Sequence, residues 1–126
     1  MSEIKNIIDD LGIAALEKST KLAGFAVMSD SGKIIYQTAN WDLANQTNVI
    51  SNVIKGDRSF VLSDGKFTIT ETTAEGFVGK SDMGLGYVIF TPFQGGVLVS
   101  YAMPGADILN LLSYLKNSTM RLIGKL

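Results

Sequence analysis

The stretch Gly76–Pro104, GFVGKSDMGLGYVIFTPFQGGVLVSYAMP, decides how the rest of the chain folds. Its apolar runs predict three short strands, which are Phe77–Ser81, Tyr87–Thr91 and Val97–Ala102. Because the loops 82–86 and 92–96 between them are short, neighbouring strands are expected to pair antiparallel. Runs of consecutive apolar residues, such as Val88-Ile89-Phe90, are typical of strands that are covered on both faces. We therefore interpret this stretch as the centre of a sheet that helices cover.

The composition indicates one globular domain spanning residues 1–126. Apolar residues make up 46% of the chain and charged residues 18%, which is enough apolar side chain for a core without crosslinks. No apolar run approaches the roughly 20 residues that a membrane-spanning helix needs, and no secretory signal pattern is expected. The chain contains no cysteine, which excludes disulfides and thiolate metal sites and favours a cytoplasmic location. A net charge of −1 with scattered Lys and Arg argues against nucleic-acid binding.

The absence of histidine bears on catalysis. Without it, Ser-His and Cys-His nucleophilic machinery and the usual zinc sites cannot be built. A lysine or carboxylate mechanism stays open, but the Asp and Glu residues are dispersed, with no pair placed as acid and base. We expect a binding protein and not an enzyme, with no cofactor and no metal.

The N-terminal segment predicts a helix followed by a hairpin. Ser2 is expected to cap a helix that begins at Glu3. Its apolar residues recur at helical spacing and would lie on a sheet; they are Ile4, Ile7, Ile8, Leu11 and Ala15. The strands Leu22–Ser29 and Lys33–Thr38 then flank a turn at residues 30–32, where Gly32 supplies a positive φ.

A short helix is predicted next, with Asn45 or Thr47 as its N-cap and Gly56 just past its C-terminal end. One of its faces is apolar and carries Val49, Ile50, Val53 and Ile54. The single tryptophan, Trp41, precedes this helix. Its more plausible role is to anchor the packing of the helix, and a binding platform is the second interpretation.

The next two strands are predicted to be Arg58–Ser63 and Lys66–Thr73, joined by Asp64-Gly65, the strongest short hairpin signal in the chain. Phe67 and Ile69 face one side of the second strand, and its polar residues face the other.

The last segment predicts a helix with an apolar stripe along one face and basic residues toward its end. The stripe consists of Ile108, Leu111, Leu112, Leu115, Thr119, Leu122, Ile123 and Leu126.

Together these elements predict an α+β fold in the order α-β-β-α-β-β-β-β-β-α. A central antiparallel sheet of about six to seven strands would carry the N- and C-terminal helices on one face and the short helix on the other.

Three features invite a functional interpretation. Gly84-Leu85-Gly86 resembles a phosphate loop, but it precedes a strand, whereas phosphate loops need a following helix N-terminus. Lys80 interrupts an apolar strand, as either a solvated edge residue or a binding residue. Lys116, Arg121 and Lys125 either complement the helix dipole or contact an anionic surface.

The order and spacing of several motifs resemble the profilin family, and the similarity is best over Arg58–Leu115. The motifs are Asp64-Gly65-Lys66-Phe67, Gly76-Phe77-Val78-Gly79-Lys80, Gly84-Leu85-Gly86-Tyr87-Val88-Ile89, Gly96-Val97-Leu98-Val99-Ser100-Tyr101 and Leu112-Ser113-Tyr114-Leu115. The short chain and short loops resemble the compact profilins of archaea related to eukaryotes more than animal profilins.

The resemblance implies a monomeric protein that binds actin monomers, regulates actin polymerisation and acts at the cytoskeleton. By position, the implied actin-binding residues are Lys66, Thr68, Lys80, Asp107 and Asn110. Glu71 departs from the family pattern, because animal members tend to carry a basic residue there.

The resemblance also implies two weaker ligands. Profilins hold proline-rich peptides between aromatic side chains of both terminal helices and a strand. Here the first helix has no aromatic residue, so only weak binding is implied, through Tyr36, Trp41 and Tyr114. Weak phosphoinositide binding would use Lys116, Arg121 and Lys125.

An alternative stays open at this point. Roadblock and longin-type modules also combine a sheet with helices before, within and after it, and they form dimeric platforms that regulate small GTPases. A stable dimer would favour that class.

Overall fold

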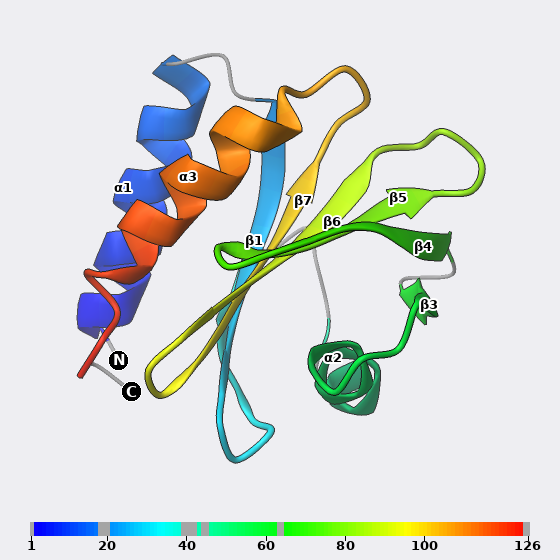
Figure 1. The fold of residues 1–126 in the computed structure, drawn as a ribbon. Coiled ribbons are helices and arrows are strands. Elements are labelled where there is room, and N and C mark those ends of the chain that lie inside the picture. Colours follow the sequence, from blue (N-terminus) through cyan, green and yellow to red (C-terminus); the bar gives the residue numbers. More distant parts are fainter. Residues whose placement is uncertain (1, 18–20, 39–42, 44–45, 63–64, 125–126) are drawn as a thin grey trace.

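We analysed a computed structural model, which describes residues 2–17, 21–38, 43, 46–62 and 65–124. Within these residues the chain forms three helices and a seven-stranded antiparallel sheet with the strand order β2-β1-β7-β6-β5-β4-β3 (Figure 1). The helices are α1 (Ser2–Glu17), α2 (Thr47–Ile54) and α3 (Ile108–Thr119). The strands are β1 (Leu22–Ser29), β2 (Ile34–Gln37), β3 (Ser59–Leu62), β4 (Gly65–Thr73), β5 (Gly76–Ser81), β6 (Tyr87–Phe93) and β7 (Gly96–Ala102).

The meander β5–β6–β7 lies at the centre of the sheet, as the sequence predicts. Its outer strands extend the sheet in both directions, because β1 pairs with β7 and β4 pairs with β5. The turn before β6 needs glycine at Gly86, where φ is 129° and an added Cβ would lie 2.4 Å from the Ala102 carbonyl oxygen. This close approach brings the β5–β6 loop against the end of β7.

Two apolar cores lie on opposite faces of the sheet. Helices α1 and α3 lie side by side and cover one face, and α2 covers part of the other (Figure 1). The alternation along β6 divides its side chains between them, so that Ile89 packs under α1 and α3 while Val88 and Phe90 pack on the α2 side. The predicted α+β fold, with both terminal helices on one face and the short helix on the other, is confirmed.

Aromatic packing explains one glycine of the central stretch. The ring of Phe60 stacks on Phe67 at a centroid distance of 5.2 Å and meets Phe90 edge-on at 5.3 Å. A Cβ on Gly79 would lie 2.6 Å from the Phe60 ring, so glycine leaves the space that this ring fills. The neighbouring Lys80 points to the opposite face and is exposed.

Several predicted boundaries are wrong by one or more residues. The loop predicted at residues 92–96 is only a two-residue turn, because β6 continues to Phe93, which pairs with Gly96. The short helix begins at Thr47 with Gln46 as its N-cap and no side-chain cap, so Thr47 is not the cap, and Asn45 lies outside the described residues. Gly56 follows the helix with a φ of 121°, as predicted.

The C-terminal helix is shorter than its apolar stripe predicts. It ends at Thr119, after which the chain continues in turns as far as Gly124, where φ is 81°. Leu122 still reaches the core and is 1% exposed. The helical period therefore persists in the sequence because the turns keep Leu122 in the core, and not because the helix continues.

Candidate functional site

A groove of about 330 Å³ opens where the first turn of α3 crosses the sheet. Its lining residues come from three strands and the helix; they are Thr70, Glu71, Val78, Lys80, Tyr87, Ile108 and Leu109. The groove is on the sheet face that carries α1 and α3, beyond the part that these helices cover.

The alternation along β4 sets one wall of this groove. Phe67 and Ile69 are buried on the α2 side, so Lys66 and Thr68 are exposed on the groove side. Thr68 lies opposite Lys80 in the β4–β5 register, which brings these predicted residues together on one surface.

A β-bulge brings two consecutive residues of β4 to the groove. The β4–β5 register shifts between Ile69 and Glu71, so the consecutive residues Thr70 and Glu71 both line the groove. Glu71 lies opposite Val78, and a carboxylate therefore stands in the same groove as the Lys80 ammonium. The groove offers both signs of charge around an apolar centre.

The start of α3 forms the other wall. Asp107 is the N-cap, and its side chain accepts hydrogen bonds from the backbone N–H of Asn110 at 3.4 Å and from the Asn110 amide Nδ2 at 2.7 Å. These two predicted residues therefore bind each other and hold the helix end in place. Ile108 and Leu109 follow the cap, and Leu109 is 69% exposed at the groove.

Exposed apolar side chains continue beside the groove. Met83 and Leu85 lie in the β5–β6 loop and Met103 follows β7, with exposures of 80%, 60% and 51%. The hydroxyl of Tyr101 donates a hydrogen bond to the Leu85 carbonyl oxygen, which links the loop to β7. Large exposed apolar residues gathered at one end of a sheet are typical of a protein-binding surface.

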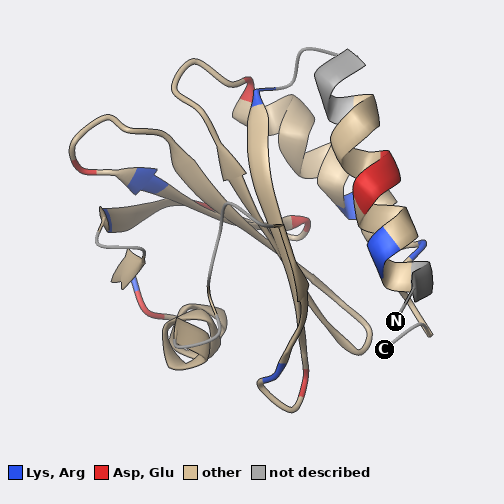
Figure 2. Cartoon of the chain, turned by 180° about the vertical axis from the view of Figure 1, so that it is seen from behind, with Lys and Arg blue, Asp and Glu red and all other residues tan. Residues whose placement is uncertain are grey.

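The charges at this end of the sheet are available to a partner. Figure 2 shows basic segments on β4 and β5 and an acidic segment in the loop after β5. Thr68 donates a hydrogen bond to the Asp82 carboxylate, with an Oγ1–Oδ1 distance of 2.9 Å. In the part of the chain that the structure describes, the ion pairs are Lys5–Asp9 and Asp10–Arg121, and neither involves Lys66 or Lys80.

Two of the three aromatic candidates, Tyr36 and Tyr114, lie elsewhere, against α1. The Tyr36 hydroxyl donates to Asp9 Oδ1 at 3.3 Å, and the Tyr114 hydroxyl donates to the Leu11 carbonyl oxygen at 3.3 Å. The hydrogen bond from Lys5 Nζ to Asp9 lowers the pKa of that carboxyl and raises the pKa of Lys5. Burial raises the pKa of the Tyr114 phenol. Trp41 lies outside the described residues.

Lys116 and Arg121, the predicted lipid-binding residues that the structure describes, contact different elements. Lys116 Nζ donates to the Pro92 carbonyl oxygen at 2.8 Å, and Arg121 pairs with Asp10 at 3.4 Å. The first contact joins α3 to β6, and the second joins the turn after α3 to α1. Lys125 lies outside the described residues.

Among the described residues, no group of three or more His, Cys, Asp or Glu side chains is arranged to hold a metal ion. No helix within the described ranges is long and apolar enough to cross a membrane.

Of the residues that the sequence predicted for this surface, Lys80 lines the groove, and the apolar residues that line it were not predicted. Leu109 falls between the residues of the buried stripe on α3, and a large apolar residue off the stripe is a signal that could have identified it. Tyr87 carries no such signal, because its place in the groove depends on how far α3 overhangs β5 and β6.

No family model matches the chain. Loki profilin-1 of Lokiarchaeum sp. (strain GC14_75) is 33% identical to it over 135 residues, which cover 94% of this chain and 98% of that protein. Loki profilin-2 of the same organism is 30% identical over 135 residues, covering 98% of each chain.

The chain belongs to the profilin family.

Solved profilin structures agree over the whole length of the chain. The fold superposes on profilin in a LokiProfilin2/rabbit actin complex with a TM-score of 0.87 and 28% identity, covering 100% of this chain and 99% of that chain. A LokiProfilin1/rabbit actin complex matches with a TM-score of 0.87 and 27% identity, covering 100% and 98%. A full-length match to profilins does not favour the dimeric GTPase platform that the sequence left open.

Proposed function

We propose that this profilin binds monomeric actin and thereby regulates actin polymerisation. The observation that carries the proposal is the match, over the whole chain, to two profilins whose structures contain rabbit actin. A protein that holds monomers lowers the concentration available to form filament nuclei, and spontaneous polymerisation slows.

The groove and its rim are the surface we assign to actin. Leu109, Ile108 and Tyr87 supply apolar area at the centre, where water exclusion contributes most to affinity. Lys66, Thr68 and Lys80 form the rim on the strands, and Asp107 with Asn110 forms the rim at the helix end. Rim charges steer association and set register more than they contribute affinity, and actin is acidic.

This role requires no catalysis, and we infer that the protein is not an enzyme. We also infer that it acts on the actin cytoskeleton, because that is where the proposed partner is found. Any binding of proline-rich peptides through Tyr36, Trp41 and Tyr114 is proposed to be weak, because α1 contributes no aromatic side chain.

The test is actin polymerisation followed over time with the wild type and with Lys80→Glu. We expect the wild type to slow spontaneous polymerisation and Lys80→Glu to bind actin about three- to tenfold more weakly at low salt, because it reverses a rim charge. Stability should change by less than about 0.5 kcal/mol, since the side chain is exposed.

Lys33→Glu is the matched control. Lys33 is an exposed lysine that follows the β1–β2 turn, away from the groove, so this variant makes the same charge change without touching the proposed surface. If the wild type fails to slow polymerisation at any excess over actin, the proposed function is wrong. If the two variants lose equal affinity, the assigned surface is wrong.

A further inference from the structure

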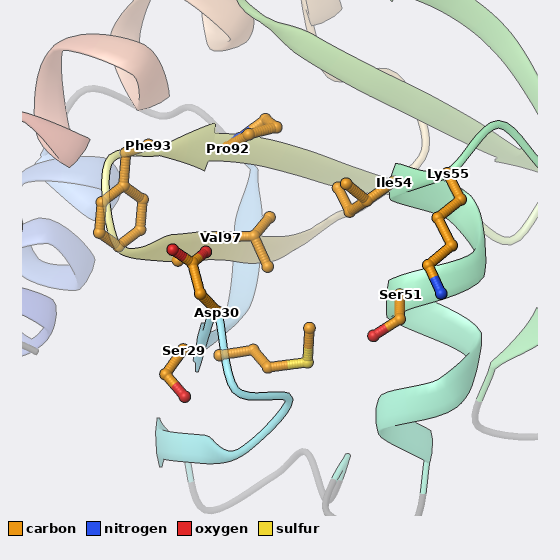
Figure 3. A pocket seen from close by; sticks show the side chains of 10 residues that line it. Ser29, Asp30, Ser51, Ile54, Lys55, Pro92, Phe93 and Val97 are labelled. Carbon is orange, nitrogen blue, oxygen red and sulfur yellow. The ribbon is translucent and has the colours of Figure 1, made fainter.

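A second hollow lies on the opposite face of the sheet, between the C-terminal end of α2 and the strands β1, β6 and β7 (Figure 3). It encloses about 270 Å³, and its floor is apolar, formed by Met28, Ile54, Pro92 and Val97, while Phe93 borders the hollow and packs on the core of the opposite face. The hollow exists because α2 has only eight residues and packs mainly toward β3, while the strands continue past its end. Part of the apolar core on the α2 face is therefore left without a helix over it.

Two opposite charges flank this apolar floor. Asp30 stands in the turn between β1 and β2, and Lys55 is the residue that ends α2, on the other side of the hollow (Figure 3). Both side chains are exposed, and neither takes part in the ion pairs found among the described residues. Their charges are thus free for a ligand.

The backbone holds both charged residues in place. The Asp30 N–H donates to the Gly95 carbonyl oxygen at 3.1 Å, which ties the β1–β2 turn to the β6–β7 turn. The Lys55 N–H donates to the Ser51 carbonyl oxygen at 3.1 Å, so the residue is fixed to the last turn of α2. The Ser51 hydroxyl points from the helix toward the strands and offers one hydrogen-bonding group between the two charges (Figure 3).

We propose that this hollow docks a short extended segment of a partner protein, in which an apolar side chain stands between a basic and an acidic residue. The apolar side chain would contact the floor, the basic residue would pair with Asp30, and the acidic residue would pair with Lys55. The hollow is smaller than the pockets of roughly 300–1,000 Å³ that bury drug-sized ligands, so it would take the apolar side chain while the rest of the segment stays at the surface.

The pair of charges argues against other ligand classes. A phosphate group or an anionic lipid surface would meet Lys55 but would be repelled by the free carboxylate of Asp30. A cationic ligand would be attracted by Asp30 but repelled by Lys55. A peptide chain carries both signs at a fixed spacing on either side of an apolar residue, and it can complement the whole rim.

The position of the hollow gives the inference a consequence for function. The groove assigned to actin is on the face that carries α1 and α3, and this hollow is on the α2 face. One profilin molecule could therefore hold actin and a second protein at the same time. Docking at the hollow does not depend on the groove, so either proposal can fail without the other.

The test is a titration of ¹⁵N-labelled protein with acetyl-Lys-Leu-Glu-amide, followed by amide chemical shifts. Two matched peptides serve as controls: acetyl-Gln-Leu-Gln-amide lacks the charges, and acetyl-Lys-Ser-Glu-amide lacks the apolar anchor. We expect shift changes confined to Met28–Asp30, Ser51–Lys55 and Phe93–Val97 and larger for the first peptide than for either control.

Charge-removing variants complete the test. Asp30→Asn and Lys55→Gln should each weaken binding about two- to fivefold, as the loss of one exposed charge pair implies. Lys33→Gln and Asp57→Asn remove charges from the same two segments outside the lining and should bind as the wild type does. The proposal is overturned if the three peptides give the same response, if millimolar peptide gives none, or if the control variants lose as much affinity as the lining variants.

Discussion

The two ends of α3 present opposite situations. At its N-terminal end, Leu109 is exposed and Lys80 on the neighbouring strand has no ion pair among the described residues. At its C-terminal end and in the turn just beyond it, two basic side chains are already engaged, Lys116 on the Pro92 carbonyl and Arg121 on Asp10. The same helix therefore offers a partner surface at one end and stabilises the fold at the other.

This difference shows that a charged residue is a candidate for binding only when no contact within the fold already engages its charge. Counted along the sequence, the lysines and arginine near the end of the chain form the more basic cluster. In the structure the charges of Lys116 and Arg121 are divided between β6 and α1, whereas Lys66 and Lys80 face solvent on one surface. A site is identified by the groups left free after folding, and not by the local density of charge.

The largest expected effect is on the packing of the whole helix α3 against the sheet. Leu112 is 1% exposed beneath the middle of the helix, so Leu112→Ala leaves a cavity in the core under α1 and α3. We expect a loss of about 2–5 kcal/mol in the free energy of unfolding, measured by urea denaturation. Ser113→Ala, next along the helix and exposed, is the control and should cost far less. A loss below about 0.5 kcal/mol for Leu112→Ala would mean that α3 is not docked on this core.

The next prediction tests whether actin binding depends on the N-terminal end of α3 and not on its C-terminal end. Leu109→Ala removes the exposed side chain at the groove while leaving the core unchanged. We expect actin binding to weaken by about 1–2 kcal/mol, as for a central apolar interface residue, with unchanged thermal stability. Met120→Ala is a suitable control, because Met120 is 65% exposed just beyond the other end of α3. Equal affinities of the two variants for actin would contradict the assignment of the groove.

These two leucines also show how far sequence reasoning reaches. Leu112 belongs to the apolar stripe, and the period of the stripe correctly predicted a helix on the sheet. Leu109 falls off the stripe, and its role depends on where the helix begins above β5 and β6. That position is set by contacts between residues far apart in the chain, which no local pattern records.

The strands show the same division. Alternation along β4 predicted that Lys66 and Thr68 share a surface, and the register then brought Lys80 beside them. The bulge between Ile69 and Glu71 has no glycine or proline to signal it, so the place of Glu71 in the groove could not be predicted. Side-chain period is readable from sequence, but the interruptions that shape a groove are not.

A smaller effect concerns the contact between α3 and α1. Tyr114→Phe removes the hydroxyl that donates to the Leu11 carbonyl, and we expect a loss of about 0.5–1.5 kcal/mol in unfolding free energy near neutral pH. The variant should leave actin binding unchanged, because Tyr114 is outside the groove. A tenfold loss of actin affinity would show that the two ends of the helix are coupled.

The same tyrosine makes a prediction about pH. Burial raises the pKa of Tyr114 above its ordinary value of 10.0, so the folded protein favours the neutral phenol. Its contribution to stability is complete below the unfolded pKa and is lost as pH rises through the folded pKa. Wild-type stability should therefore fall above about pH 10 more steeply than that of Tyr114→Phe, as thermal denaturation at several alkaline pH values would measure. Parallel curves would contradict the link between burial and titration.

The smallest expected effect tests the C-terminal end of α3 as a lipid-binding surface. A basic residue near an anionic membrane contributes about 1 kcal/mol, but only if its charge is free. Lys116 and Arg121 must first leave the Pro92 carbonyl and Asp10, which offsets much of that gain. We therefore expect weak sedimentation with phosphoinositide-containing liposomes, lost when salt is raised above physiological concentration because screening shortens the reach of exposed charges.

Asp10→Asn sharpens this test without changing any basic residue. It releases Arg121 from its partner, so liposome binding should increase slightly, by about two- to fivefold, the range expected for one exposed ion pair. Asp57→Asn makes the same charge change outside this end of α3 and controls for net charge. Binding that persists undiminished in high salt would mean a specific lipid pocket at this end of the helix, and the two ends of α3 would then both be binding surfaces.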